Sequence, residues 1–113
     1  MKTALLIALM AVASQLAYAG GDMAAGAAKS KPCAACHGAD FSTPVSPDIP
    51  RLAGQHADYL ARALTDYQSG ARKNAVMGGQ ATALSPQDIQ DLAAYFESVS
   101  GKLKVIRLHR LVH

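Results

Sequence analysis

Apolar residues recur at helical spacing in two stretches of the chain, and each stretch predicts an amphipathic helix with one apolar face. In residues 57–69, Leu60, Leu64 and Tyr67 fall at positions i, i+4 and i+7, and Gly70 is placed to end that helix. In the second stretch, near the end of the chain, the apolar stripe consists of Ile89, Leu92, Ala93, Phe96 and Val99.

Local signals fix where this second helix begins. Ser85 is a favourable N-cap, Pro86 suits the first helical position, and Asp88 stands where it can complete a capping box. Gly101 supplies the expected stop.

A third, short helix of small residues is expected over residues 23–29, with Asp22 as its cap and an end before Pro32. Alternating runs of β-branched and aromatic residues bounded by turns do not occur, which indicates an all-α domain. Residues 38–55 contain three prolines and residues 70–84 contain three glycines, so both are expected to be long loops that carry function.

The first residues differ from the rest of the chain. Lys2 is followed by an unbroken apolar run over residues 4–13, and Ala17-Tyr18-Ala19 gives the small-x-small pattern that precedes a cleavage site. The run is well short of the roughly 20 residues that an uncleaved membrane anchor needs. Residues 1–19 are therefore interpreted as a cleaved signal peptide, which leaves an exported domain over residues 20–101.

The formal net charge of +3 is unevenly distributed. Residues 102–113 carry only basic charges and follow a mildly acidic domain, so they are interpreted as a solvated basic tail. No basic stripe interleaved with aromatic residues occurs within the domain, and nucleic-acid binding is therefore not expected.

The strongest chemical signal is the run Cys33-Ala34-Ala35-Cys36-His37. Two thiols at this spacing on a helical turn can add to the two vinyl groups along one haem edge, and the adjacent histidine then lies beneath the iron. Imidazole is a suitable axial ligand for haem iron. The motif predicts haem c, bound covalently through Cys33 and Cys36, with His37 as the first axial ligand of its iron.

Three other interpretations of the cysteine pair compete with haem attachment. A thioredoxin-like dithiol would lie in a strand-helix-strand context, which the pattern lacks. A structural zinc site needs four ligands, and the remaining histidines, His56, His109 and His113, are scattered. A local disulfide would explain neither the adjacent histidine nor the long loops.

Few residues can serve as the second axial ligand. Outside the signal peptide the only methionines are Met23, on the expected first helix, and Met77, in the glycine-containing segment that begins at Asn74. A lone methionine usually fills core space, but here flanking glycines allow the backbone to approach a flat macrocycle. Met77 is therefore the expected ligand, and His56 is its rival.

Several further motifs accompany the cysteine pair. They are Pro50-Arg51-Leu52-Ala53-Gly54-Gln55 with Tyr59-Leu60, Gly70-Ala71-Arg72 before Met77, and Leu84-Ser85 leading to Asp91-Leu92-Ala93-Ala94-Tyr95-Phe96. With these motifs, residues 22–100 resemble the class I c-type cytochromes, particularly the small bacterial periplasmic ones related to each half of the di-haem cytochromes.

The resemblance implies a cytochrome c fold, in which about three to five short helices and long loops wrap around one covalently bound haem. It implies that the Pro50 carbonyl accepts a hydrogen bond from Nδ1 of His37, and that Leu52 lies against the haem. Tyr67 is expected among the apolar residues that surround the haem. The resemblance also places Gly26 against Tyr95 or Phe96. One departure is Asp40-Phe41, because family members often carry a glycine after the acidic residue.

The implied function is electron transfer in the periplasm, without enzymatic activity and without a membrane anchor after signal cleavage. The expected partners are a donor dehydrogenase or cytochrome complex and an acceptor oxidase or reductase, reached by diffusion or, in a dedicated subunit, through the basic tail. Arg51, Arg72 and Lys73 are candidates to neutralise the haem carboxylates. The alternative is a ligand-binding sensor or peroxidase-like protein, which requires that Met77 does not bind the iron.

Overall fold

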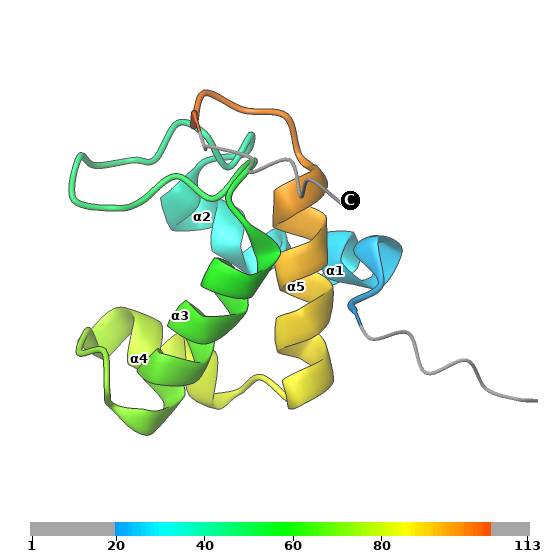
Figure 1. Cartoon of the computed structure of the whole chain (residues 1–113). Helices are drawn as coiled ribbons and strands as arrows, with labels where there is room; N and C mark the ends of the chain where they lie inside the picture. The colour runs from blue at the N-terminus through cyan, green and yellow to red at the C-terminus, as the bar shows by residue number, and fades with distance from the viewer. Residues whose placement is uncertain (1–19, 105–113) are drawn as a thin grey trace, which may run out of the picture.

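The computed structural model describes residues 20–104, and all regular secondary structure in that range is helical (Figure 1). The helices are α1 (Met23–Lys29), the 3-10 turn η1 (Lys31–Cys33), α2 (Ala34–His37), α3 (Ala57–Ser69), α4 (Ala75–Thr82) and α5 (Pro86–Ser98). The all-α prediction is confirmed. The expected signal peptide, residues 1–19, and residues 105–113 of the expected tail lie outside the described residues.

Helices α1 and α5 cross at a point where the two backbones nearly touch. A Cβ atom added at Gly26 would lie 2.0 Å from the carbonyl oxygen of Asp91 and 2.7 Å from Cβ of Tyr95. Only glycine fits such an approach without displacing the partner helix. The expected contact between this glycine and an aromatic residue is present, and Tyr95 rather than Phe96 is the partner.

A buried carboxylate joins the same two helices. Asp91 is 3% exposed and accepts hydrogen bonds from the backbone N–H of Asp22 at 2.8 Å, from Nζ of Lys29 at 2.6 Å and from Nε2 of Gln87 at 2.8 Å. Led by the Lys29 ammonium, these donors lower the pKa of Asp91 to about 2. The α1–α5 crossing is thus fixed by charge as well as by close packing.

Helices α3 and α5 lie side by side, with the beginning of α3 near the end of α5 (Figure 1). Backbone N–H groups at the start of α3 find acceptors on α5, since Ala57 donates to Oε2 of Glu97 and Gly54 donates to the carbonyl of Phe96. The core between them and the preceding loop consists of Phe41, Ala53, Leu60, Leu92, Ala93 and Phe96.

The chain differs from expectation at two places that concern glycines. Helix α5 ends at Ser98, before the stop expected at Gly101. A Cβ at Gly101 would lie 2.1 Å from Oγ of Ser42 and 2.7 Å from Cβ of Ala53, so this glycine permits close packing and does not terminate the helix.

The second difference is that residues 70–84, expected as a loop, contain the helix α4. The side chain of Asn74 accepts hydrogen bonds from the backbone N–H groups of Val76 and Met77, both at 3.0 Å, and so begins the helix. At the other end of α4, Gln68 of α3 donates to the carbonyl of Ala81, in the last turn, and to that of Leu84, just after the helix, both at 2.8 Å. These contacts outweigh the low helix propensity of glycine.

Within residues 20–104, no helix combines the length and the apolar character that crossing a bilayer requires.

Candidate haem site

One large cavity, of about 740 Å³, opens between the loop after α2 and the helices α3 and α4. Its volume lies in the range of roughly 300–1,000 Å³ that is typical of cofactor sites. The loop supplies prolines and other apolar side chains, and α3 supplies the face on which Leu60, Leu64 and Tyr67 recur. Six of the seven residues expected to form the site line this cavity: Cys33, His37, Pro50, Leu52, Tyr67 and Met77.

His37 is buried at the end of α2, and its ring is held in one orientation. Its Nδ1 atom lies 2.8 Å from the carbonyl oxygen of Pro50. A carbonyl oxygen can only accept, so Nδ1 carries a hydrogen atom and donates a hydrogen bond to it, which leaves Nε2 as the ring nitrogen available to a metal ion. The expected hydrogen bond is present, and it prepares Nε2 to bind a metal ion.

The two cysteines lie one helical turn apart, and no disulfide joins them. Cys33 is partly buried and lines the cavity, and this burial raises the pKa of its thiol. Cys36 is exposed and does not line the cavity. In the described range of 20–104, no three His, Cys, Asp or Glu side chains gather into a group that could hold a metal ion.

Met77 reaches the cavity from α4, where it is half-buried. The Asn74 cap at the start of α4 and the Gln68 bonds at its far end fix the helix that carries it. His56, the rival ligand, occupies the N-cap position of α3 and is absent from the cavity lining. The geometry therefore favours Met77 over His56 as the side chain that faces the cavity opposite α2.

The loop that follows His37 makes its turn without the glycine that the family often has. Asp40 accepts hydrogen bonds from the backbone N–H groups of Ser42 at 2.9 Å and Thr43 at 2.8 Å, and these bonds lower the pKa of its carboxyl. Phe41 takes the left-handed conformation, with φ of 55°, that glycine would adopt most easily. The backbone carbonyl of Phe41 accepts bonds from Leu52 and Ala53 and thereby positions the Pro50 segment.

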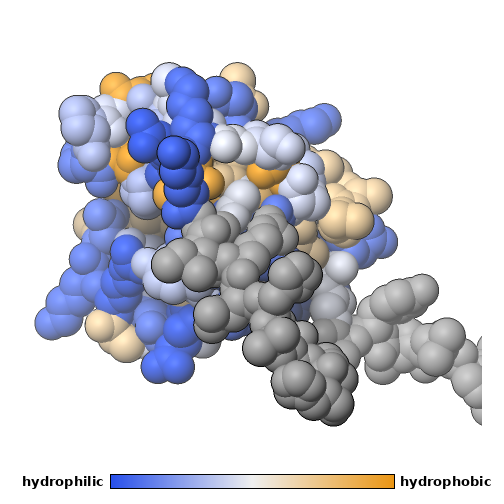
Figure 2. Space-filling model, turned by 45° about the horizontal axis from the view of Figure 1, so that its top comes forward, coloured by the Kyte–Doolittle hydropathy of each residue, from blue (hydrophilic) through white to orange (hydrophobic). Residues whose placement is uncertain are grey.

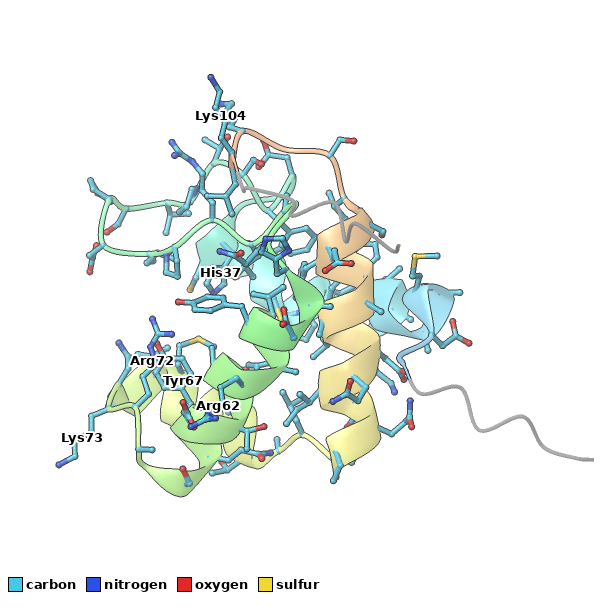
Figure 3. All side chains as sticks on the ribbon, viewed as in Figure 1. His37, Arg62, Tyr67, Arg72, Lys73 and Lys104 are labelled. Atoms are coloured by element: carbon cyan, nitrogen blue, oxygen red, sulfur yellow. The ribbon has the colours of Figure 1, made fainter. Side chains whose placement is uncertain are left out.

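Of the candidates to neutralise the haem carboxylates, Arg51, Arg72 and Lys73, the two arginines line the cavity. Arg51 lines the cavity and donates from Nε to the carbonyl of Ser42 at 2.9 Å. Arg72 lines it too, with its guanidinium 5.0 Å from the ring centroid of Tyr67. Lys73 is exposed and does not line the cavity, and its side chain points away from His37 and Tyr67 (Figure 3).

The cavity wall includes two residues of the segment that was expected to be a solvated tail. Lys102 and Leu103, assigned to the solvated tail, form part of the cavity wall. No local pattern marks Lys102, because its hydrogen-bond partners, Ser42 and Thr43, lie about 60 residues earlier in the chain.

The surface of the molecule carries both hydrophobic and hydrophilic side chains. Figure 2 shows small hydrophobic patches set between hydrophilic side chains on the face that it presents. Two of the exposed large hydrophobic residues, Val45 and Tyr59, also line the cavity, so its rim is partly apolar.

Comparison with known proteins decides the family, since the model of the cytochrome c family matches residues 23–100. The chain belongs to the cytochrome c family. It is 51% identical over 83 residues to cytochrome c4 of Pseudomonas aeruginosa, with 74% of this chain and 41% of that protein covered. It is 44% identical over 81 residues to cytochrome c-554(548) of Halomonas halodenitrificans, with 69% and 96% covered.

Among solved structures, that of reduced recombinant cytochrome c4 from Pseudomonas stutzeri matches with a TM-score of 0.68 and 40% identity, covering 74% of this chain and 48% of that one. The chain thus spans about half the length of the cytochrome c4 proteins that it matches. Haem c, with its iron, is the cofactor of this family, and Cys33-Ala34-Ala35-Cys36-His37 fits the attachment motif. The cavity, its apolar lining and the oriented His37 ring fit that group.

Proposed function

We propose that this cytochrome c is a periplasmic electron carrier that exchanges single electrons with redox proteins and converts no substrate of its own. The observation that carries the proposal is the pair of potential iron ligands on one cavity: His37, oriented by Pro50, and Met77, held on α4. Haem c, when bound, supplies an iron that alternates between iron(II) and iron(III).

The residues of the chain have separate tasks in this proposal. Cys33 and Cys36 would hold the cofactor covalently, and His37 and Met77 would both bind its iron, which would leave no position for a substrate. Leu52, Leu60 and Leu64 keep water from the cavity and so disfavour the extra positive charge of iron(III), as does a methionine ligand.

The sequence and the relatives support a periplasmic location and redox partners. The signal peptide expected over residues 1–19 supports export to the periplasm. A further relative, from Stutzerimonas stutzeri, is named a thiosulfate dehydrogenase electron acceptor, and one from Chlorobaculum tepidum a cytochrome subunit of sulfide dehydrogenase. These names support a dehydrogenase as the electron donor, with docking at the partly apolar rim near Val45 and Tyr59.

Covalent attachment is tested by expressing the full chain with a periplasmic haem-attachment system and staining for haem on a denaturing gel. The wild type and the control Ala35→Ser, which changes an exposed residue between the cysteines, are expected to retain haem. The double variant Cys33→Ala/Cys36→Ala is expected to lose it. Haem that remains bound to the double variant after denaturation would contradict the proposal.

The carrier function is tested by adding carbon monoxide to the reduced protein. With both axial positions occupied, the visible spectrum is expected to stay unchanged. A rapid spectral change at low carbon monoxide concentration would instead favour the ligand-binding sensor or peroxidase-like protein.

A further inference from the structure

We propose that Lys102 and Leu103 belong to the haem pocket, where they close one side of the cavity and place a positive charge at its wall. The proposal rests on the haem site proposed above and extends it to a segment that follows the last helix. Figure 1 shows this segment, after α5, turning back beside the loop that follows α2.

The backbone of the segment is docked on that loop. At Gly101 the approach is so close that an added Cβ would lie 2.1 Å from Oγ of Ser42. The next backbone N–H, that of Lys102, donates to the same Oγ at 3.1 Å. Ser42 is only 2% exposed, so its hydroxyl is a fixed anchor and not a solvated surface group.

The side chains then cover the cavity. Nζ of Lys102 donates to Oγ1 of Thr43 at 3.3 Å, and both residues line the cavity. Leu103 also lines it and is half-buried, which an apolar side chain in a solvated tail would not be. Lys104 is exposed, as Lys102 is, but unlike Lys102 it does not line the cavity, and it points outward in Figure 3.

The charges at this wall of the cavity are expected to affect the reduction potential of the haem. Arg51 and Lys102 both bond to the turn at residues 42–43, while Asp40 is the carboxylate bonded to the same turn, so one net positive charge remains there. This net positive charge would partly offset the negative charge of the two carboxylates that a haem carries. A positive charge at the wall of the haem cavity also disfavours iron(III), because two like charges repel each other. Lys102 is therefore a positioning residue that raises the reduction potential.

The test compares Lys102→Gln with Lys104→Gln in the full chain, which removes the same charge from neighbouring positions. Reduction potentials are measured by spectroelectrochemistry at low ionic strength, where screening is weakest. Lys102→Gln is expected to lower the potential and Lys104→Gln to leave it near that of the wild type. Equal potentials in all three proteins, or equal shifts in both variants, would overturn the role of Lys102.

A second pair of variants tests the docked segment without removing its charge. Gly101→Ala displaces the segment from Ser42, and Leu103→Ser admits water to the cavity, so both are expected to lower the reduction potential. Unchanged potentials in both would show that the segment does not close the pocket. Haem staining of every variant separates this outcome from failure of the haem site itself, which would abolish staining in the wild type.

Discussion

The ring of Phe41 packs edge-on against the ring of Phe96, with ring centroids 4.8 Å apart, although Phe41 has a positive backbone φ of 55°. A left-handed conformation costs a non-glycine residue roughly 1–2 kcal/mol. Burying a phenylalanine side chain contributes about 1.5–3 kcal/mol, and the aromatic pair adds to this. The packing of the ring therefore offsets the strain of its backbone.

Phe41→Gly and Phe41→Ala are both expected to destabilise the haem-containing protein, because each removes the buried ring at a cost of about 3–5 kcal/mol. Phe41→Gly should nevertheless be the more stable of the two by about 1 kcal/mol, since only alanine keeps the strain at positive φ. Chemical denaturation followed by circular dichroism measures both free energies of unfolding.

The matched control is the same pair of substitutions at Phe96, which lies inside α5. There the order should reverse, with Phe96→Gly less stable than Phe96→Ala by about 1 kcal/mol because glycine is a poor helix former. The same order at both positions would contradict the assignment of strain to Phe41.

Substitution by alanine should change the free energy of unfolding in opposite directions at two helical glycines. Gly26→Ala is expected to lower the free energy of unfolding by about 1–3 kcal/mol, because its Cβ meets the backbone of α5 at 2.0 Å. Gly79 is exposed and does not line the cavity, and no atom outside its own helix lies within 4 Å of an added Cβ, so Gly79→Ala is expected to raise this free energy by about 0.5–1 kcal/mol. A thermal melt of each variant suffices, and a neutral Gly26→Ala would contradict the close crossing of α1 and α5.

Protonation of Asp91 should lower the free energy of unfolding at acid pH. Its pKa falls from 3.8 when unfolded to about 2 when folded, so the ionised folded form is favoured. The resulting stabilisation, about 2 kcal/mol, is complete above the unfolded pKa and is lost as the pH falls through the folded one. Asp91→Asn is expected to weaken the loss of stability between pH 4 and pH 2, as measured by denaturation at several pH values.

Asp48→Asn serves as the control for that experiment, because it neutralises a carboxylate on an exposed part of the loop after α2. This variant should lose stability between pH 4 and pH 2 to the same extent as the wild type. If Asp91→Asn also lost stability to that extent, the buried ion pair between α1 and α5 would not be the source.

Sequence reasoning succeeded where the determining contacts are local. The capped starts at Asp22 and Ser85 and the apolar spacing in α3 each depend on residues within about two turns, and the observed helices begin where these signals place them. The hydrogen bond between His37 and Pro50 was anticipated only through the family resemblance, because it joins residues 13 positions apart across an irregular loop.

The failures involve contacts between distant residues. Helix α4 depends on Gln68 of α3 as well as on its own Asn74 cap, so glycine propensity alone gave a loop. Lys102 depends on Ser42, 60 residues earlier, and nothing in the composition of the tail indicates that contact. Tertiary contacts overrode local preference in both segments.

Near-infrared absorption of the oxidised protein, measured for the wild type and for Met77→Ala, tests the central claim most directly. A weak charge-transfer band from sulfur to iron should be present in the wild type and absent from the variant, while haem staining remains in both. Absence of the band from the wild type would contradict ligation by Met77 and would leave His56 or an open, ligand-binding iron to be considered.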